Sequence, residues 1–128
     1  MENKIILANI IDACNYNCRY CYNVLPRNKN RLNLDALYYF ITNSIANKKE
    51  NVVLNIEGGE PTLHPELVKF CEKIQVLDNV QVYVYTNFSA NIFVYEELLN
   101  CNNVNIIATW HLIDLAHTYA FLYKLRKL

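Results

Sequence analysis

Short runs of β-branched and aromatic residues alternate along this chain with segments whose apolar residues recur at helical spacing. Such alternation is typical of βα units, whose strands lie parallel in one sheet. The runs are nearly continuous in hydrophobicity, which favours a sheet covered on both faces. The sequence therefore predicts an α/β fold with four strands, over residues 5–11, 52–56, 80–85 and 104–108.

Four helices are predicted between and after these strands. The first begins after Asn33, a residue type common at helix N-caps, and the third lies near residues 91–100. In the second, Pro65 suits the first helical position and His64 the cap. Cys71 falls on the apolar stripe of that helix, which predicts a buried thiol without a chemical role. The fourth helix is expected over residues 112–128.

Length and charge limit the kinds of partner. A chain of 128 residues with two glycines and three prolines has room for one core but not for a linker, so one domain is expected. Twelve basic residues balance twelve acidic ones, which argues against binding to nucleic acid or to an anionic membrane. No apolar run approaches the ~20 residues of a membrane span, and no signal peptide is recognisable. We therefore expect a cytoplasmic protein.

Three of the five cysteines lie within eight residues, directly after the first predicted strand. Cys14, Cys18 and Cys21 suit metal ligation in a reducing compartment better than a disulfide framework. Three thiolates leave one metal position open, as a catalytic site requires. The alternative is a zinc site that His64 or His111 completes after folding, because zinc and iron–sulfur sites both use thiolates.

The only two glycines of the chain follow the second strand, in the sequence Gly58-Gly59-Glu60-Pro61. Adjacent glycines permit a positive φ and a close approach of the backbone to a ligand. Gly58 and Gly59 could therefore offer backbone groups to a cofactor while Glu60 accepts from its amine. The same residues are also compatible with a plain turn and a solvated glutamate.

In motif and order, C-x-x-x-C-x-x-C after a first strand and Gly-Gly-Glu-Pro after a second resemble the radical S-adenosylmethionine (SAM) enzymes. The resemblance implies that three cysteines hold a [4Fe–4S] cluster and that the amino and carboxylate groups of SAM chelate its fourth iron. The implied ligands are Cys14, Cys18 and Cys21. The positions implied to contact SAM are Tyr20, Gly58, Gly59, Glu60, Thr86, Asn87 and Thr109, with Tyr20 near the adenine and Glu60 on the amino group.

The implied reaction uses one electron, from a donor such as flavodoxin or ferredoxin, to cleave SAM into methionine and a 5'-deoxyadenosyl radical. That radical removes a hydrogen atom from a substrate, a peptide or a small molecule, which the sequence does not identify. Thr86-Asn87 after the third strand and Thr109-Trp110-His111 after the fourth resemble polar positions that contact the methionine and ribose parts of SAM. A lone histidine such as His111 is more often a hydrogen-bonded structural residue than a base, and the sequence assigns no role in the reaction to His117. The alternative function is a small metal- or SAM-binding module, with zinc or an iron–sulfur cluster, that performs no radical chemistry.

The resemblance also implies a partial (βα) TIM-like barrel. The core of that family has six βα units, whereas about four are predicted here, so residues 1–128 are expected to form a single incomplete core domain. A fragment of a longer enzyme, a subunit completed by a partner chain or by self-association, and an inactive remnant all remain open. An unpaired fourth strand would favour association, because an apolar strand edge pairs readily with another chain.

Overall fold

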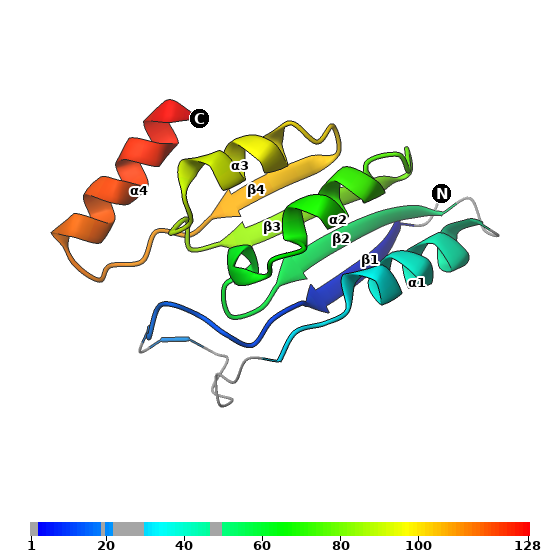
Figure 1. Ribbon diagram of the computed structural model, residues 1–128, viewed down its shortest axis with the longest axis horizontal. Coiled ribbons are helices and arrows are strands. Elements are labelled where there is room, and N and C mark those ends of the chain that lie inside the picture. Colours follow the sequence, from blue (N-terminus) through cyan, green and yellow to red (C-terminus); the bar gives the residue numbers. More distant parts are fainter. Residues whose placement is uncertain (1–2, 19, 22–29, 47–49) are drawn as a thin grey trace.

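The computed structural model describes residues 3–18, 20–21, 30–46 and 50–128. Within these residues, strands and helices alternate along the chain, as Figure 1 shows. The strands are β1 (Asn3–Asn9), β2 (Asn51–Glu57), β3 (Val80–Thr86) and β4 (Val104–Ala108). The α-helices are α1 (Leu34–Ala46), α2 (Leu67–Ile74), α3 (Ile92–Leu99) and α4 (Leu115–Lys127), with a short 3-10 helix η1 (Pro61–Leu63) before α2.

The strands form one parallel sheet in the order β1-β2-β3-β4, which confirms the predicted α/β fold. β4 has the predicted bounds, but β1 ends two residues before the predicted end. The N–H of Ile10 donates to the carbonyl of Glu57 at 3.0 Å, and β2 ends at that residue. Ile11 then pairs antiparallel with Arg31. Beyond Ile10 the chain bonds to the turn after β2 and to Arg31, and it no longer continues the regular parallel pairing.

Side-chain caps set where two helices begin. The Asn33 carboxamide oxygen accepts from the N–H of Ala36 at 3.1 Å at the start of α1, and that of Asn91 accepts from Phe93 at 3.1 Å at the start of α3. Both starts match the sequence prediction.

The prediction for the second helix is wrong at its start. α2 begins at Leu67, so Pro65 lies in the turn before the helix and not at its first position. The residues before this turn form η1, and His64 is the C-cap of η1. The His64 ring nitrogen Nδ1 accepts from the N–H of Glu66 at 3.1 Å, so this histidine stabilises the turn between the two helices.

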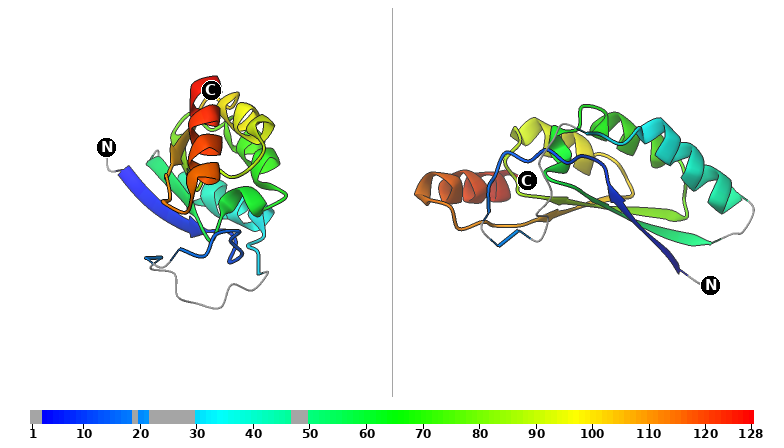
Figure 2. Two further views of the ribbon diagram at one scale, coloured as in Figure 1. Left: turned by 90° about the vertical axis from the view of Figure 1, so that its left-hand side faces the viewer. Right: turned by 90° about the horizontal axis from the view of Figure 1, so that it is seen from below.

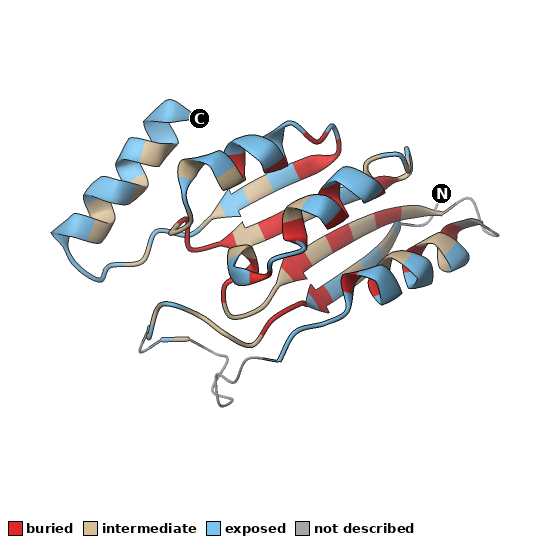
Figure 3. Ribbon diagram, in the orientation of Figure 1, coloured by how far each residue is buried: buried red, intermediate tan, exposed pale blue. Residues whose placement is uncertain are grey.

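The core lies between the sheet and the layer formed by α1, α2 and α3, which cover one face (Figure 2). Figure 3 shows buried positions alternating along β2 and β3, because successive side chains of a strand point to opposite faces. Cys71 is fully buried in this core, as predicted for its place on the apolar stripe of α2.

The opposite face of the sheet is open, so the expectation of a sheet covered on both faces is wrong for the described residues. Ile5 and Leu7 of β1 are 66% and 69% exposed, and Ile107 of β4 is also exposed. Apolar residues on both faces of a strand are equally compatible with the inner wall of an incomplete barrel, and the comparisons below support that interpretation.

α4 does not join the helical layer. It lies beyond the carboxyl ends of the strands, where Figures 1 and 2 show it standing clear of the sheet, and none of its residues is buried. It begins at Leu115, later than predicted, because the Asp114 carboxylate caps it by accepting from the N–H of His117 at 2.8 Å. No helix of the described residues is long and apolar enough to cross a membrane.

Candidate functional site

A cavity of about 260 Å³ lies at the carboxyl ends of the strands and is lined by all ten residues that the sequence singled out. These come from four separate segments: the loop after β1, the turn after β2, the end of β3 and the residue after β4. The parallel arrangement explains the gathering, because the carboxyl ends of parallel strands meet at one edge of a sheet. The ten are Cys14, Cys18, Tyr20, Cys21, Gly58, Gly59, Glu60, Thr86, Asn87 and Thr109.

The two glycines let the loop after β1 and the turn after β2 touch through their backbones. A Cβ at Gly58 would lie 2.5 Å from the carbonyl oxygen of Ile11, and one at Gly59 would lie 2.1 Å from that of Ala13. The N–H of Gly59 donates to Ile11 at 2.7 Å and that of Glu60 to Ala13 at 2.8 Å. No described glycine has a positive φ, so close approach, not an unusual backbone conformation, excludes a side chain here.

The carboxylate of Glu60 is 1% exposed and joins the ends of two strands. Its Oε1 accepts from the N–H and the hydroxyl of Thr62, at 3.1 and 2.6 Å, and from the Thr86 hydroxyl at 2.6 Å. Its Oε2 accepts from the N–H of Asn87 at 2.7 Å. The alternative of a solvated glutamate is therefore wrong. The contact between Glu60 and the amino group of SAM stays a prediction, and the geometry gives this residue a bracing role as well.

Local contacts fix the turn after β3, which carries Asn87 at the cavity. Phe88 has a φ of 63°, which is rare for a bulky residue and is typical of functional turns. Its N–H donates to the Thr86 hydroxyl at 3.0 Å, and its ring packs on Tyr95 with 4.5 Å between the ring centroids. The strained turn is thus fixed from both its backbone and its side chain.

The three thiols line the cavity but are not gathered around one point. Cys14, Cys18 and Cys21 are partly exposed and form no disulfide with one another, and the N–H of Tyr16 donates to the sulfur of Cys14 at 3.4 Å. Among the described residues, no three histidine, cysteine or acidic side chains lie close enough together to hold a metal ion. As a donor set, three accessible thiols beside one cavity fit an iron–sulfur cluster.

His111, which follows β4, reaches the cysteine loop. Its Nδ1 lies 3.5 Å from the sulfur of Cys18 and 2.7 Å from the hydroxyl of Tyr20, and the Tyr20 and His111 rings stack with 5.8 Å between centroids. Burial lowers the pKa of His111, and the nearby carboxylate of Glu60 has a smaller, opposite effect. Burial therefore favours the neutral imidazole, and the tautomer sets whether Nδ1 accepts from the Tyr20 hydroxyl or donates to it.

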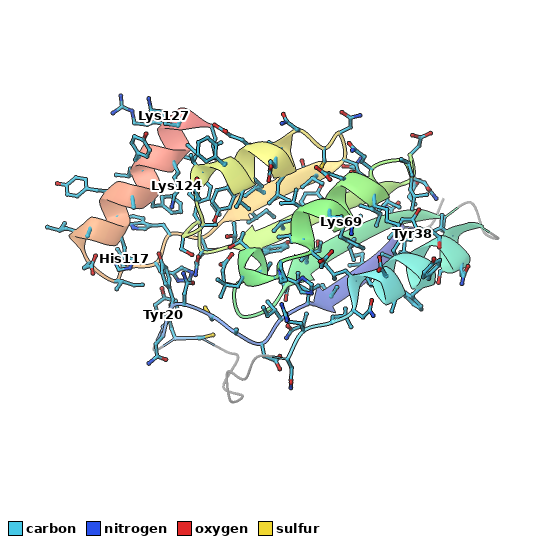
Figure 4. The ribbon with its side chains drawn as sticks, viewed as in Figure 1. Tyr20, Tyr38, Lys69, His117, Lys124 and Lys127 are labelled. Atoms are coloured by element: carbon cyan, nitrogen blue, oxygen red, sulfur yellow. The ribbon has the colours of Figure 1, made fainter. Side chains whose placement is uncertain are left out.

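The other two histidines are placed differently. His64 lies outside this cavity, and its Nε2 donates to the carbonyl of Leu32 at 2.9 Å. The ring of His117 lies 2.7 Å from the carboxylate of Asp114 on α4. Of the two histidines that could complete a zinc site with the cysteines, only His111 is at the cavity. Figure 4 shows Tyr20 and His117 at this same end of the sheet.

Three further residues line the cavity without having been assigned a role from the sequence, namely Tyr16, Glu57 and Tyr85, and His111 lines it as well. Strand alternation could have found Tyr85, because it shares the open face of β3 with residues two positions away along the strand. Tyr16 and His111 belong to loops, where the sequence carries no periodic signal.

The family described as the Radical SAM superfamily matches residues 8–109 of this chain. That segment begins in β1 and ends at Thr109, so it contains all ten residues predicted from the sequence.

Two solved structures resemble the fold. BtrN, in complex with AdoMet and 2-DOIA, superposes with a TM-score of 0.73 at 19% identity, covering 89% of this chain and 48% of BtrN. Streptococcus suis SuiB, bound to the precursor peptide SuiA, superposes with a TM-score of 0.66 at 17% identity, covering 91% of this chain and 26% of SuiB. This chain therefore spans half or less of the length of either protein.

A curated relative matches part of the sequence. The GTPase Obg of Brachyspira hyodysenteriae is 30% identical over 83 residues, which is 60% of this chain and 12% of that protein. A phosphate-binding loop of the form G-x-x-x-x-G-K-[ST] needs two glycines five positions apart, whereas the two glycines here are adjacent. The match therefore carries no argument for nucleotide hydrolysis by this chain.

Proposed function

The chain belongs to the radical SAM superfamily, and on that premise we propose that it binds one [4Fe–4S] cluster and one SAM molecule in the cavity at the ends of its strands. One observation carries the proposal: ten residues chosen from sequence motifs, spread over nearly a hundred positions, line one cavity. BtrN, the neighbour with the higher TM-score, is itself an AdoMet complex, which supports SAM as the cofactor.

In this proposal Cys14, Cys18 and Cys21 are the thiolate ligands of the cluster. The cluster and SAM together supply a 5'-deoxyadenosyl radical for removal of a hydrogen atom from substrate. The protein supplies binding and orientation, as is general for enzymes whose cofactors carry the difficult chemistry. The loop that carries the thiols is tied to the sheet through Ile11 and Ala13, whose carbonyls accept from the turn after β2.

The remaining residues of the cavity would orient SAM. Gly58 and Gly59 keep the backbone of their turn against the cysteine loop, so that the cavity wall contains no side chain there. Glu60 holds the ends of β2 and β3 in register, which places Thr86 and Asn87 on the opposite wall. Tyr20 is proposed to lie against the adenine, and its stacking on His111 supports this by fixing the ring at the cavity.

Anaerobic reconstitution tests the cluster ligands. Wild-type protein should load one [4Fe–4S] cluster per chain, and Cys14→Ala, Cys18→Ala and Cys21→Ala should each abolish loading, because each thiolate is a direct ligand. The matched control is Cys101→Ala, which removes a buried thiol outside the cavity. Iron and sulfide assays with a visible spectrum decide the outcome. Full loading of the Cys14→Ala variant would contradict the assignment.

We propose that the substrate, a peptide or a small molecule, contacts the open face of the sheet. SuiB is bound to a precursor peptide and BtrN to 2-DOIA, so the two neighbours support one class each. On the open face Tyr83 and Tyr85 of β3 are only partly buried, and Tyr85 also lines the SAM cavity. A substrate on this face would therefore lie next to the cofactor.

We further propose that residues 1–128 form an incomplete core domain that works with additional βα units, from a longer form of the same chain, from a partner chain or from a second copy. The open face of the sheet supports this, as does β4, which pairs only with β3 within the described residues. This chain covers 48% of BtrN, which agrees with a chain that contains only part of the core.

A second candidate function is a zinc-binding module without radical chemistry. One contact favours it: Nδ1 of His111 lies 3.5 Å from the sulfur of Cys18, so an imidazole lies beside one of the three thiols. A tetrahedral site would need Cys14 and Cys21 to move toward this pair, because the described thiols are not gathered around one point. Metal analysis of protein purified without oxygen separates the candidates. Zinc at one equivalent that resists replacement by iron and sulfide, and that is lost in His111→Ala, would favour the zinc module.

A further inference from the structure

A second cavity, of about 270 Å³, adjoins the proposed SAM cavity. The two share the residues Tyr16, Asn87 and His111. The far wall of the second cavity is α4, which supplies His117, Ala120, Phe121 and Lys124. This wall exists because α4 lies beyond the strand ends and not in the helical layer.

The second cavity is lined by cationic and neutral groups, with no carboxylate among its lining residues. The SAM cavity differs, because Glu57 and Glu60 line it. The cation is Lys124, which Figure 4 shows on α4 at the end of the sheet. Its amine donates to the carbonyl of Phe88 at 2.9 Å and makes no ion pair with any described residue. Burial lowers the pKa of Lys124, and no acidic group opposes this effect.

The Ser89 hydroxyl is a second hydrogen-bond donor, on the same wall of the cavity as Asn87. The Asn87 carboxamide donates to the carbonyl oxygen of the Asn15 side chain at 2.9 Å, and Asn15 donates in turn to the Ser89 hydroxyl at 2.9 Å. The Ser89 oxygen is thereby used as an acceptor, which leaves its hydrogen to donate. No acceptor for that hydrogen is found among the described residues. Ser89 lines the cavity together with Lys124.

We propose that this second cavity binds a carboxylate group through the Lys124 amine and the Ser89 hydroxyl, an inference that rests on the proposed function because the carboxylate would lie beside SAM. The single positive charge of the Lys124 amine is balanced by a ligand with one negative charge. A carboxylate carries that charge, whereas a phosphate group carries more negative charge at neutral pH. Since the family resemblance has the carboxylate of SAM chelating the cluster, the group proposed here is a carboxylate of the substrate, and a carboxylate of SAM is the other outcome that the test separates.

The first experiment needs no cluster. Trp110 is the only tryptophan of the chain and lines the second cavity, so its fluorescence reports on occupancy. Benzoate should bind at least about tenfold more tightly than benzamide, its neutral counterpart of similar shape, since a hydrogen bond to a charged group is the stronger one. Lys124→Met should abolish the preference and Lys124→Arg should keep it. Lys127→Met, on the exposed part of the same helix, is the control.

The second experiment is calorimetry of SAM with cluster-loaded protein. A substrate carboxylate predicts that Lys124→Met leaves SAM binding unchanged while the preference for benzoate is lost, and that Ser89→Ala weakens the binding of benzoate but not of SAM. If Lys124→Met instead weakens SAM binding by about tenfold and leaves the binding of decarboxylated SAM unchanged, the carboxylate is that of SAM and the proposal is overturned.

The proposal is also overturned if benzoate binds no better than benzamide to wild-type protein. Failure of the proposed function has a different signature. If no cluster loads, the comparison of benzoate with benzamide on cluster-free protein still decides whether the cavity prefers a carboxylate.

Discussion

Replacing Glu60 by glutamine tests whether this carboxylate braces the site. Its oxygens accept four hydrogen bonds from three residues, Thr62, Thr86 and Asn87, and the side chain is 1% exposed. Glutamine has one acceptor oxygen and an NH₂ group in place of the other. With its oxygen in the place of Oε1, the NH₂ faces the N–H of Asn87, so that two donors meet and that buried bond is lost.

The expected cost follows from these bonds. Leaving a buried donor unsatisfied costs about 1 to 3 kcal/mol, and the remaining three bonds weaken because their acceptor is no longer charged. We therefore expect Glu60→Gln to lower the free energy of unfolding by about 3 kcal/mol in the cluster-free protein. Urea unfolding followed by circular dichroism measures this directly, with a lower midpoint and an unchanged m-value.

Glu66→Gln is the matched control, because Glu66 is exposed and its ion pair with Lys69 spans 3.8 Å at the surface. Its loss should cost less than about 0.5 kcal/mol. A double-mutant cycle of Glu60→Gln with Thr86→Val should show coupling, since the two side chains share a bond of 2.6 Å. A Glu60→Gln variant as stable as wild type, with SAM binding lost, would refute the bracing role and leave Glu60 as a cofactor ligand alone.

Two further predictions concern the rest of the chain. In cluster-free protein, a thiol reagent such as dithionitrobenzoate should quickly modify Cys14, Cys18 and Cys21. Cys71 and Cys101 should react only after unfolding, because burial raises the pKa of both buried thiols. Fast reaction of all five thiols in folded protein would contradict this placement. The isolated chain should associate or be poorly soluble, because β4 has an open edge and α4 exposes residues such as Leu115 and Leu125, at 74% and 57%. Sedimentation velocity measures the association, and a stable monomer that produces 5'-deoxyadenosine and turns over a substrate alone would show that four βα units suffice.

The sequence alone was enough to predict the parallel α/β sheet and to select ten residues that line one cavity. Strand and helix periods are local properties, so the bounds of β4, the cap Asn33 and the place of the third helix followed from neighbouring residues. The residues of the cavity could be predicted to lie together because the carboxyl ends of parallel strands all lie at one edge of a sheet. Any residue that directly follows such a strand, Thr109 included, must then lie near the others.

Tertiary structure decided the features that depend on contacts between distant segments. The sequence indicates that Gly58 and Gly59 are special, but only the fold shows that Ile11 and Ala13 occupy the space of a side chain. The contact of Glu60 with a cofactor stays a prediction, and only the fold shows that donors from the end of β3 also hydrogen-bond its carboxylate.

The sequence also did not predict where α4 packs. Its apolar residues predict a helix, but these residues can pack against a sheet, pack against a partner chain or remain exposed. Periodicity does not distinguish these cases. In the fold, the Asp114 cap starts α4 beyond the strand ends, and Lys124 reaches back to the carbonyl of Phe88. The second cavity is therefore a property of the packing, since it is formed by residues more than a hundred positions apart that no local pattern connects.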